Sequence, residues 1–293
     1  MIISWKKFFE NVGKIGISDI HAYIEGMELS SEDKLFFLNN IVPDVIVDFG
    51  CADGTILSKI KRIKPSIRLV GYDMDKQMIV KARSRFSDDT VITDSWKEVT
   101  KIVSEYKNPT LVLSSVIHEV YSYSTTKVVK KFWDNQVFGG SFKYICIRDM
   151  IPSVEMDRQV HKGINSEDFM DDVRKIRMKA NTYYLESFED IWGSISNSYR
   201  TLIHFLLKYK YTDNWNREVN ENYVPITLET LYKKIPNNYS ILTKENYILP
   251  NLEEQVKKDF DIDIIHTTHT KMIIKNNTFI LNQHHYPKQK NTN

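Results

Sequence analysis

The segment 45–54 restricts the fold of this chain more than any other stretch, because it ends an apolar run with a glycine-bounded loop. It reads Val-Ile-Val-Asp-Phe-Gly-Cys-Ala-Asp-Gly and is followed at once by a helical pattern from Thr55. A strand, a tight turn and a helix start in this order direct backbone N–H groups at a ligand. Gly50 and Gly54 let the main chain approach that ligand without an intervening Cβ. The segment therefore predicts a ligand-binding turn in an α/β protein.

Short apolar runs alternate with helical patterns from residue 44 to residue 150. Strands are expected at 45–49, 67–73, 90–93, 110–115 and 144–149, with helices between them. This alternation implies right-handed crossovers and a parallel sheet. After a stretch of helical patterns, which includes one long helix at 188–210, strand patterns return at 239–249 and 268–274.

These patterns divide the chain into five segments. We expect an N-terminal helical segment at 1–43 that packs on the sheet edge, a ligand-binding core at 44–150, a helical insertion at 151–235, the rest of the core sheet at 236–282 and a flexible tail at 283–293. The insertion holds 12 Lys and Arg against 13 Asp and Glu, so it is not basic as a whole. We expect it to act as a substrate lid.

Composition limits the class of protein and its surroundings. The 293 residues have 42% hydrophobic content and a net charge of +2, which fits a folded globular protein and neither demands nor excludes nucleic acid. No signal peptide and no apolar run of roughly 20 residues is visible, so no membrane partner is expected. Cys51 and Cys146 indicate no disulfide framework, and no Cys/His spacing suggests a metal site. A reducing, cytoplasmic location is therefore expected.

Asp73 is the second anchor of the expected binding site. It ends the second predicted strand, and in open α/β sheets ligands bind beyond the carboxyl ends of the strands. A carboxylate there can accept hydrogen bonds from both ribose hydroxyls of an adenosine, or it can cap the next helix. Nicotinamide-dinucleotide enzymes share this pairing of a turn with an acid, but their Gly-x-Gly is absent from this chain.

The ordered set Asp48-x-Gly50-x-x-x-Gly54, Asp73, Asp94-Ser95 and Ser114 to Glu119 resembles the class I S-adenosylmethionine-dependent methyltransferases over residues 44–150. The resemblance implies S-adenosyl-L-methionine as the cofactor. It also implies a seven-stranded, mostly parallel sheet with helices on both faces, an antiparallel last strand and a helical insertion between strands 5 and 6. The cofactor-binding residues that it implies are Asp48, Gly50, Cys51, Ala52, Asp53, Gly54, Asp73, Met74, Asp94, Ser95 and Ser114.

Three residues are predicted to be catalytic: His118 and Glu119, which follow the fourth strand, and Arg148, which lies at the end of the fifth. In the resembling family, the segment after the fourth strand borders the transferred methyl group and the substrate. A neutral His118 could take a proton from the acceptor while Glu119 orients it, or both could be structural. Arg148 could hold a substrate carboxylate or phosphate, or pair with Asp149.

Three functions remain open at this stage. The first is methyl transfer to an O or N atom of a small-molecule acceptor, which the balanced charge favours. The second is methylation of RNA, DNA or a nucleotide, because lysines and aromatic residues alternate within 204–223. The third is a non-catalytic nucleotide-fold module that binds a partner through the insertion. The sequence indicates neither the methyl acceptor nor the oligomeric state.

Overall fold

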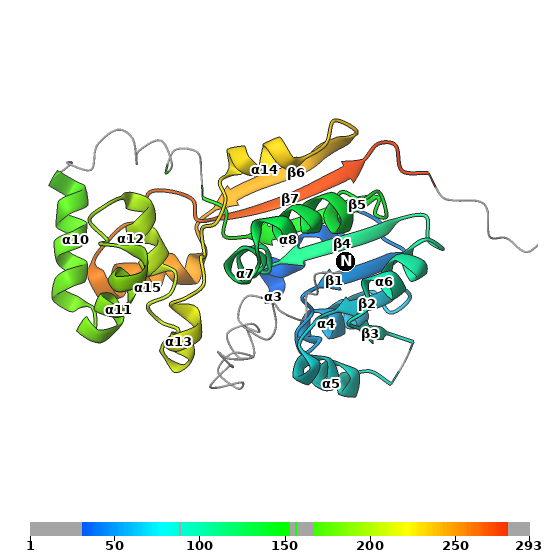
Figure 1. Ribbon diagram of the computed structural model, residues 1–293, viewed down its shortest axis with the longest axis horizontal. Helices are drawn as coiled ribbons and strands as arrows, with labels where there is room; N and C mark the ends of the chain where they lie inside the picture. The colour runs from blue at the N-terminus through cyan, green and yellow to red at the C-terminus, as the bar shows by residue number, and fades with distance from the viewer. Residues whose placement is uncertain (1–30, 88, 153–155, 157–166, 281–293) are drawn as a thin grey trace, which may run out of the picture.

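The computed structural model of this protein describes residues 31–87, 89–152, 156 and 167–280. The predictions for the tail at 283–293 and for residues 1–30 lie outside the described residues. Seven strands form one sheet in the order β3-β2-β1-β4-β5-β7-β6 (Figure 1). Their bounds are β1 (Val45–Phe49), β2 (Arg68–Tyr72), β3 (Val91–Thr93), β4 (Pro109–Ser114), β5 (Tyr144–Asp149), β6 (Tyr239–Tyr247) and β7 (His269–Asn276).

The sheet is mixed, which corrects the prediction of a mostly parallel sheet. The ladders β1–β2, β1–β4, β2–β3 and β4–β5 are parallel, whereas both ladders of β7 are antiparallel. Tyr247 at the end of β6 pairs with His269 at the start of β7, so the chain re-enters the sheet at the end where it left. β7 must therefore run back, and the antiparallel last strand that the resemblance implied is confirmed.

Both faces of the sheet are covered, and the alternating side chains of β1 show this. Val45, Val47 and Phe49 belong to one buried cluster, to which α6 and α8 also contribute. Ile46 belongs to a second cluster with α4 and α5. Because both faces are buried, β1 is apolar apart from Asp48. The covering helices are α4 (Thr55–Ile63), α5 (Lys76–Arg85), α6 (Trp96–Val103), α7 (Ile117–Tyr123), α8 (Thr126–Lys131) and the π-helix η2 (Phe132–Val137).

A separate group of helices lies beside one end of the sheet (Figure 1). These helices share their own buried apolar cluster, which also takes in α15 from the connection between β6 and β7. By contrast, α14 contributes Leu228 and Leu231 to the cluster of the sheet. The bounds are α10 (Glu167–Lys179), α11 (Thr182–Trp192), α12 (Tyr199–Leu206), η3 (Thr212–Asn214), α13 (Trp215–Glu218), α14 (Leu228–Lys234) and α15 (Pro250–Phe260).

The prediction of a single helix at 188–210 is wrong, because the helix is interrupted between α11 and α12. Gly193 ends α11 with a φ of 81°, a backbone angle that side-chain-bearing residues rarely adopt. The side chain of Ser198 then accepts a hydrogen bond from the backbone N–H of Thr201 and begins α12. Among the described helices, none combines the length and the apolar character needed to span a membrane.

Candidate active site

The turn after β1 is held tightly between β2 and α7. The backbone N–H groups of Gly50 and Cys51 donate to the carbonyl of Tyr72, at 2.7 and 3.1 Å. Positive φ angles occur at Gly50 (75°), Ala52 (46°) and Gly54 (80°). A Cβ placed on Gly50 would lie 2.7 Å from Cγ2 of Val116. The turn therefore needs glycine at position 50, and Ala52 carries the backbone strain typical of ligand-binding turns.

Asp73 fixes this turn through its carboxylate. Oδ2 accepts a hydrogen bond from the backbone N–H of Ala52 at 2.7 Å. Oδ1 accepts from the N–H groups of Met74 and Asp75, at 2.7 and 2.9 Å. Burial raises the pKa of Asp73, and these N–H donors oppose the rise. Since each carboxylate oxygen has two acceptor positions, Oδ2 keeps one for a ligand hydroxyl.

Two side chains of the turn face the protein interior. Asp53 accepts hydrogen bonds from the backbone N–H and the hydroxyl of Thr55, at 3.1 and 3.0 Å, and pairs with Arg85. The thiol of Cys51 is buried, and burial raises its pKa. A ligand at this turn would therefore meet the backbone of residues 50–54 rather than these two side chains.

Asp48 lies buried at the end of β1, with Lys34 of α3 (Ser31–Lys34) as its positive neighbour. Burial raises the pKa of Asp48 to about 7, against the opposing charge of Lys34. Burial likewise lowers the pKa of Lys34 to about 8. The sequence favoured packing of the segment 1–43 on the sheet edge, whereas α3 brings its charged residues to the strand ends.

The residues after β3 have different surroundings. Asp94 is exposed, and the hydroxyl of Ser95 accepts a hydrogen bond from the N–H of Glu98 at 3.3 Å and caps α6. The ring of Trp96 packs against Phe49 and Tyr72, with centroids 5.5 and 5.2 Å apart. Ser95 thus fills a capping role, while a contact of Asp94 with adenine stays a prediction.

Two serines stand at the carboxyl end of β4, Ser114 as its last residue and Ser115 directly after it. The hydroxyl of Ser114 is buried and has no hydrogen-bond partner among the described residues. Ser115 adopts a φ of 55°, a second strained position beside the turn after β1. An unsatisfied buried hydroxyl costs about 1–3 kcal/mol, so a polar ligand atom there would be stabilising.

His118 is oriented by Asp149, the last residue of β5. Oδ2 of Asp149 accepts hydrogen bonds from the backbone N–H groups of Val116 and Ile117, at 2.9 and 2.7 Å. Oδ1 lies 2.9 Å from Nδ1 of His118. Burial lowers the pKa of His118, but the carboxylates of Asp149, Glu221 and Glu119 together outweigh burial, and the pKa is raised overall. Asp149 therefore fixes both the start of α7 and the direction of the imidazole.

Arg148 is held by residues far apart in the chain. Its Nε donates to Asp33 at 2.8 Å and to the hydroxyl of Tyr247 at 3.1 Å, and Nη1 donates to Ser115 at 2.8 Å. Nη2 is buried and has no hydrogen-bond partner among the described residues. The pairing with Asp149 that the sequence left open is replaced by these contacts, and Nη2 is the one guanidinium nitrogen of Arg148 without a partner among the described residues.

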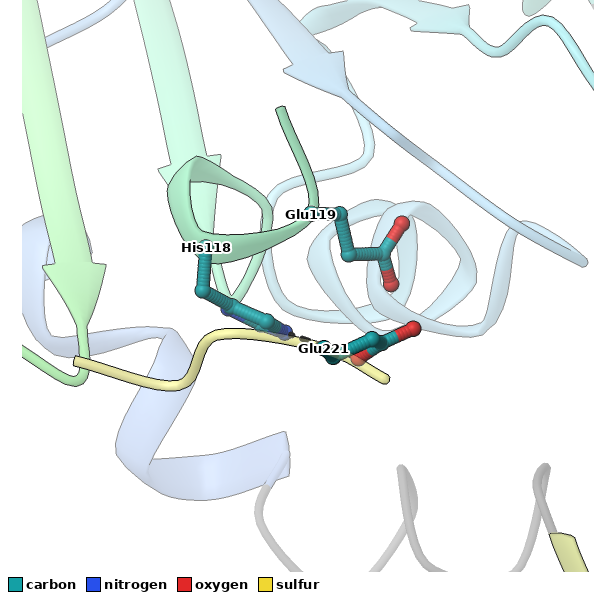
Figure 2. A group of neighbouring side chains, drawn as sticks. All are labelled: His118, Glu119 and Glu221. Atoms are coloured by element: carbon teal, nitrogen blue, oxygen red, sulfur yellow. Dashed lines mark ion pairs between the residues drawn. The ribbon is translucent and has the colours of Figure 1, made fainter. Parts of the chain in front are cut away.

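Glu119 pairs with Arg217, whose Nη2 lies 3.1 Å from Oε1 of Glu119. Figure 2 shows His118 and Glu119 directed toward Glu221, from the segment after α13. The sequence analysis did not single out Glu221, Lys34 or Asp149 as site residues. Asp149 could have been identified from its position, because it ends a strand and Asp48 and Asp73 lie within one residue of strand ends. Nothing in the sequence around Glu221 marks it in this way.

Comparisons with known proteins give weak similarities. No family model and no curated protein matches the chain. The chain is similar to the plantazolicin methyltransferase BamL in complex with an analogue and SAH, at 10% identity, a TM-score of 0.43 and coverage of 88% of this chain and 86% of that chain. It is also similar to the N-methyltransferase NodS from Bradyrhizobium japonicum WM9, at 10% identity, a TM-score of 0.39 and coverage of 85% and 95%.

A third similar structure is PKMT2 from Rickettsia typhi, at 13% identity, a TM-score of 0.45 and coverage of 87% of this chain and 53% of that chain. These similarities are too weak to transfer a substrate or a site residue. The seven-stranded sheet with its antiparallel last strand, together with the glycine-bounded turn after β1, defines an open, mixed α/β fold.

Proposed function

We propose that this chain transfers a methyl group from S-adenosyl-L-methionine to an O or N atom of a small-molecule acceptor. One observation carries the proposal. The chain runs outward from β1 to β2 and β3 and then returns to β4, so the strand order reverses between β1 and β4. Open α/β sheets bind ligands at such a reversal, beyond the carboxyl strand ends. The turn at 50–54 and the segment 114–119 flank this point.

The residues at the reversal fit the proposed cofactor. The backbone of the turn can approach a ligand at Gly50, where the main chain is exposed. Oδ2 of Asp73 retains an acceptor position for a ribose hydroxyl. The hydroxyl of Ser114 is buried without a described partner. We assign the cofactor to these residues and keep the other implied residues, Asp48, Met74 and Asp94 among them, as predictions.

The bound cofactor would supply a methyl group on a positively charged sulfur. The protein's own contribution is then alignment of the acceptor and exclusion of water, which is enough for many methyl transfers. Arg148 would hold an acceptor anion through Nη2, and His118 remains a predicted proton acceptor. The helices between β5 and β6, which the sequence assigned to a lid, are proposed to cover the acceptor.

Two observations bear on the nucleic-acid alternative and on the predicted cytoplasmic location. The Nζ atom of Lys208 donates to backbone carbonyls, and Lys210 pairs with Asp259 at 2.6 Å. These cations of the aromatic-rich stretch are therefore engaged within the protein, which favours a small acceptor over a nucleic acid. Cys51 and Cys146 are buried free thiols, which fits the cytoplasmic location that we propose.

Calorimetry with S-adenosyl-L-methionine and its demethylated product tests the proposal. We expect one binding site per chain in the wild type and at least about tenfold weaker binding in Asp73→Ala, because the turn loses its anchor and the ribose its acceptor. Asp75→Asn, which alters only the cap of α5, is the matched control. Absence of binding to the wild type would favour the non-catalytic module instead.

A labelled-methyl assay then identifies the acceptor class. Pools of small molecules, RNA and protein are incubated with the wild type at low and high salt. We expect label in the small-molecule pool at both salt concentrations. Label in RNA that disappears steeply with salt would overturn the small-molecule assignment in favour of the nucleic-acid alternative.

A further inference from the structure

Three side chains with metal-binding atoms meet beside the start of α7. The ligand-type atoms of His118, Glu119 and Glu221 all lie within 4.8 Å of one another. His118 and Glu119 are adjacent on α7, and Glu221 comes from the segment after α13 (Figure 2). The group is therefore assembled by folding, since one of its members comes from a distant part of the chain.

The imidazole of His118 is prepared for a ligand on its second nitrogen. Nδ1 is occupied by Asp149 at 2.9 Å, which leaves the lone pair on Nε2 when His118 is neutral. The side chain of His118 is 6% exposed, and Nε2 lies 3.7 Å from Oε2 of Glu221, too far for a hydrogen bond. Metal-binding histidines commonly donate their other N–H to a carboxylate in this way.

Both carboxylates are held by Arg217, and Glu221 keeps one of its oxygens directed toward His118. Oε1 of Glu221 accepts from Nε of Arg217 at 2.9 Å and from the hydroxyl of Tyr123 at 2.7 Å, whereas Oε2 faces His118. Oε1 of Glu119 accepts from Nη2 of Arg217 at 3.1 Å. Two carboxylates thus share one guanidinium, and a further positive charge would be stabilising.

We propose that His118, Glu119 and Glu221 bind one divalent transition-metal ion, with Asp149 and Arg217 as the outer residues that orient them. One imidazole and two carboxylates suit Mn²⁺ or Zn²⁺ better than Mg²⁺ or Ca²⁺, which prefer oxygen ligands alone. Three protein ligands leave coordination positions open for water or a substrate oxygen. The sequence indicated no metal site, because Glu221 lies far from the His118-Glu119 pair in the chain.

The metal ion would also change the role of His118, a consequence that rests on the proposed methyl transfer. Nε2 cannot bind a metal ion and accept a proton at the same time. A hydroxyl acceptor bound to the ion would instead lose its proton to water, because the ion lowers the pKa of that hydroxyl. This favours acceptors with a hydroxyl group over amines.

Metal binding is tested without cofactor or acceptor, so its outcome is independent of the proposed methyl transfer. The full chain is freed of metal with a chelator and titrated with Mn²⁺, and free Mn²⁺ is followed by electron paramagnetic resonance. Zn²⁺ binding is measured by competition with a coloured chelator. We expect one site per chain, and a Kd more than about tenfold weaker in His118→Ala and in Glu221→Gln.

Glu218→Gln is the matched control, because Glu218 is a buried carboxylate of the same segment that accepts a hydrogen bond from Tyr223 and supplies no ligand atom to this group. Its metal affinity should fall clearly less than that of Glu221→Gln, because only the charge interaction with Glu221 and His118 is lost. Asp149→Asn keeps all three ligands and should weaken binding by about 10–100-fold through misorientation of His118. Thermal unfolding of each variant confirms that it is folded. A wild type that binds neither Mn²⁺ nor Zn²⁺, or a folded His118→Ala with unchanged affinity, would overturn the proposal.

Discussion

Gly50 and Val116 lie so close together that a single added carbon at Gly50 would come within 2.7 Å of Cγ2 of Val116. The contact joins the turn after β1 to the residue that precedes α7. The two chain segments that flank the strand reversal are therefore packed directly against each other, and a change in one displaces the other.

Gly50→Ala is expected to lower the free energy of unfolding by about 1–3 kcal/mol, from the positive φ and the overlap with Val116. Urea unfolding of the single variant and of Gly50→Ala/Val116→Ala separates the two causes. Recovery of part of the loss in the double variant would show the overlap; no recovery would leave the backbone angle as the sole cause.

Asp48→Asn is expected to change how stability depends on pH. The folded pKa of Asp48 is raised from 3.8 to about 7, so between these values the unfolded chain has lost a proton that the folded chain retains. Wild-type stability therefore falls as pH rises from about 4 to about 7. Asn has no proton to lose, so the variant should gain stability over the wild type across that window, by a few kcal/mol at pH 7.

Urea unfolding between pH 4.5 and pH 7.5 measures this gain. Asp134→Asn, which alters an exposed aspartate of η2, serves as the control and should follow the wild type. A gain that is constant over the whole range would contradict the raised pKa of Asp48.

Lys208→Met is expected to destabilise the protein by about 1–3 kcal/mol, because two buried carbonyls lose their donor. Nζ of Lys208 donates to the carbonyls of Glu218 and Glu221, and its side chain is fully buried. Lys210→Met removes a partly exposed ion pair with Asp259 and a contact with the ring of Tyr209, and it should cost at most about 1 kcal/mol. Thermal unfolding compares them, and equal losses would argue against the role of Lys208.

Asp149→Asn should cost more stability than Asp75→Asn. Asp149 accepts hydrogen bonds from three backbone N–H groups, those of Val116, Ile117 and Met150, and also contacts His118. Asp75 accepts from two N–H groups at the start of α5, and loss of such a cap costs about 1 kcal/mol. Chemical unfolding at pH 7 ranks the two variants, and the reverse order would contradict the central position of Asp149.

The strands of the core could be predicted because each is a short apolar run that ends in a polar turn, and β5 was predicted with its observed bounds, 144–149. The interruption of the helix at Gly193 was missed because the apolar spacing continues on both sides of it. The two helices are separated by residues 193–198, which begin with the φ of 81° at Gly193 and end with the capping Ser198. Lys208 illustrates a harder limit. Its neighbours in sequence suggested an exposed base, whereas tertiary packing buries it against carbonyls from a later segment.

The site residues likewise divide into those whose place in the sequence marks them and those brought in by tertiary packing. Asp73 was predicted from the rule that ligands gather at the carboxyl ends of strands, and Asp149, which was not predicted, obeys the same rule. Glu221 lies in an irregular stretch after α13, and nothing in its local sequence marks it as a neighbour of His118. Its position depends on how the helices between β5 and β6 pack, which is a property of the assembled fold.

The contacts of Arg148 also impose an order on the maturation of the chain during synthesis. Asp33 leaves the ribosome well before Arg148, but Tyr247 and Lys271, which both bind Asp33, emerge much later. When β5 has been translated, the guanidinium of Arg148 can therefore contact Asp33, but Tyr247 has not yet been made. The contacts of Asp33 and Arg148 are complete only when β7 enters the sheet between β5 and β6. The last of the described strands to be translated therefore completes the arrangement at the strand ends.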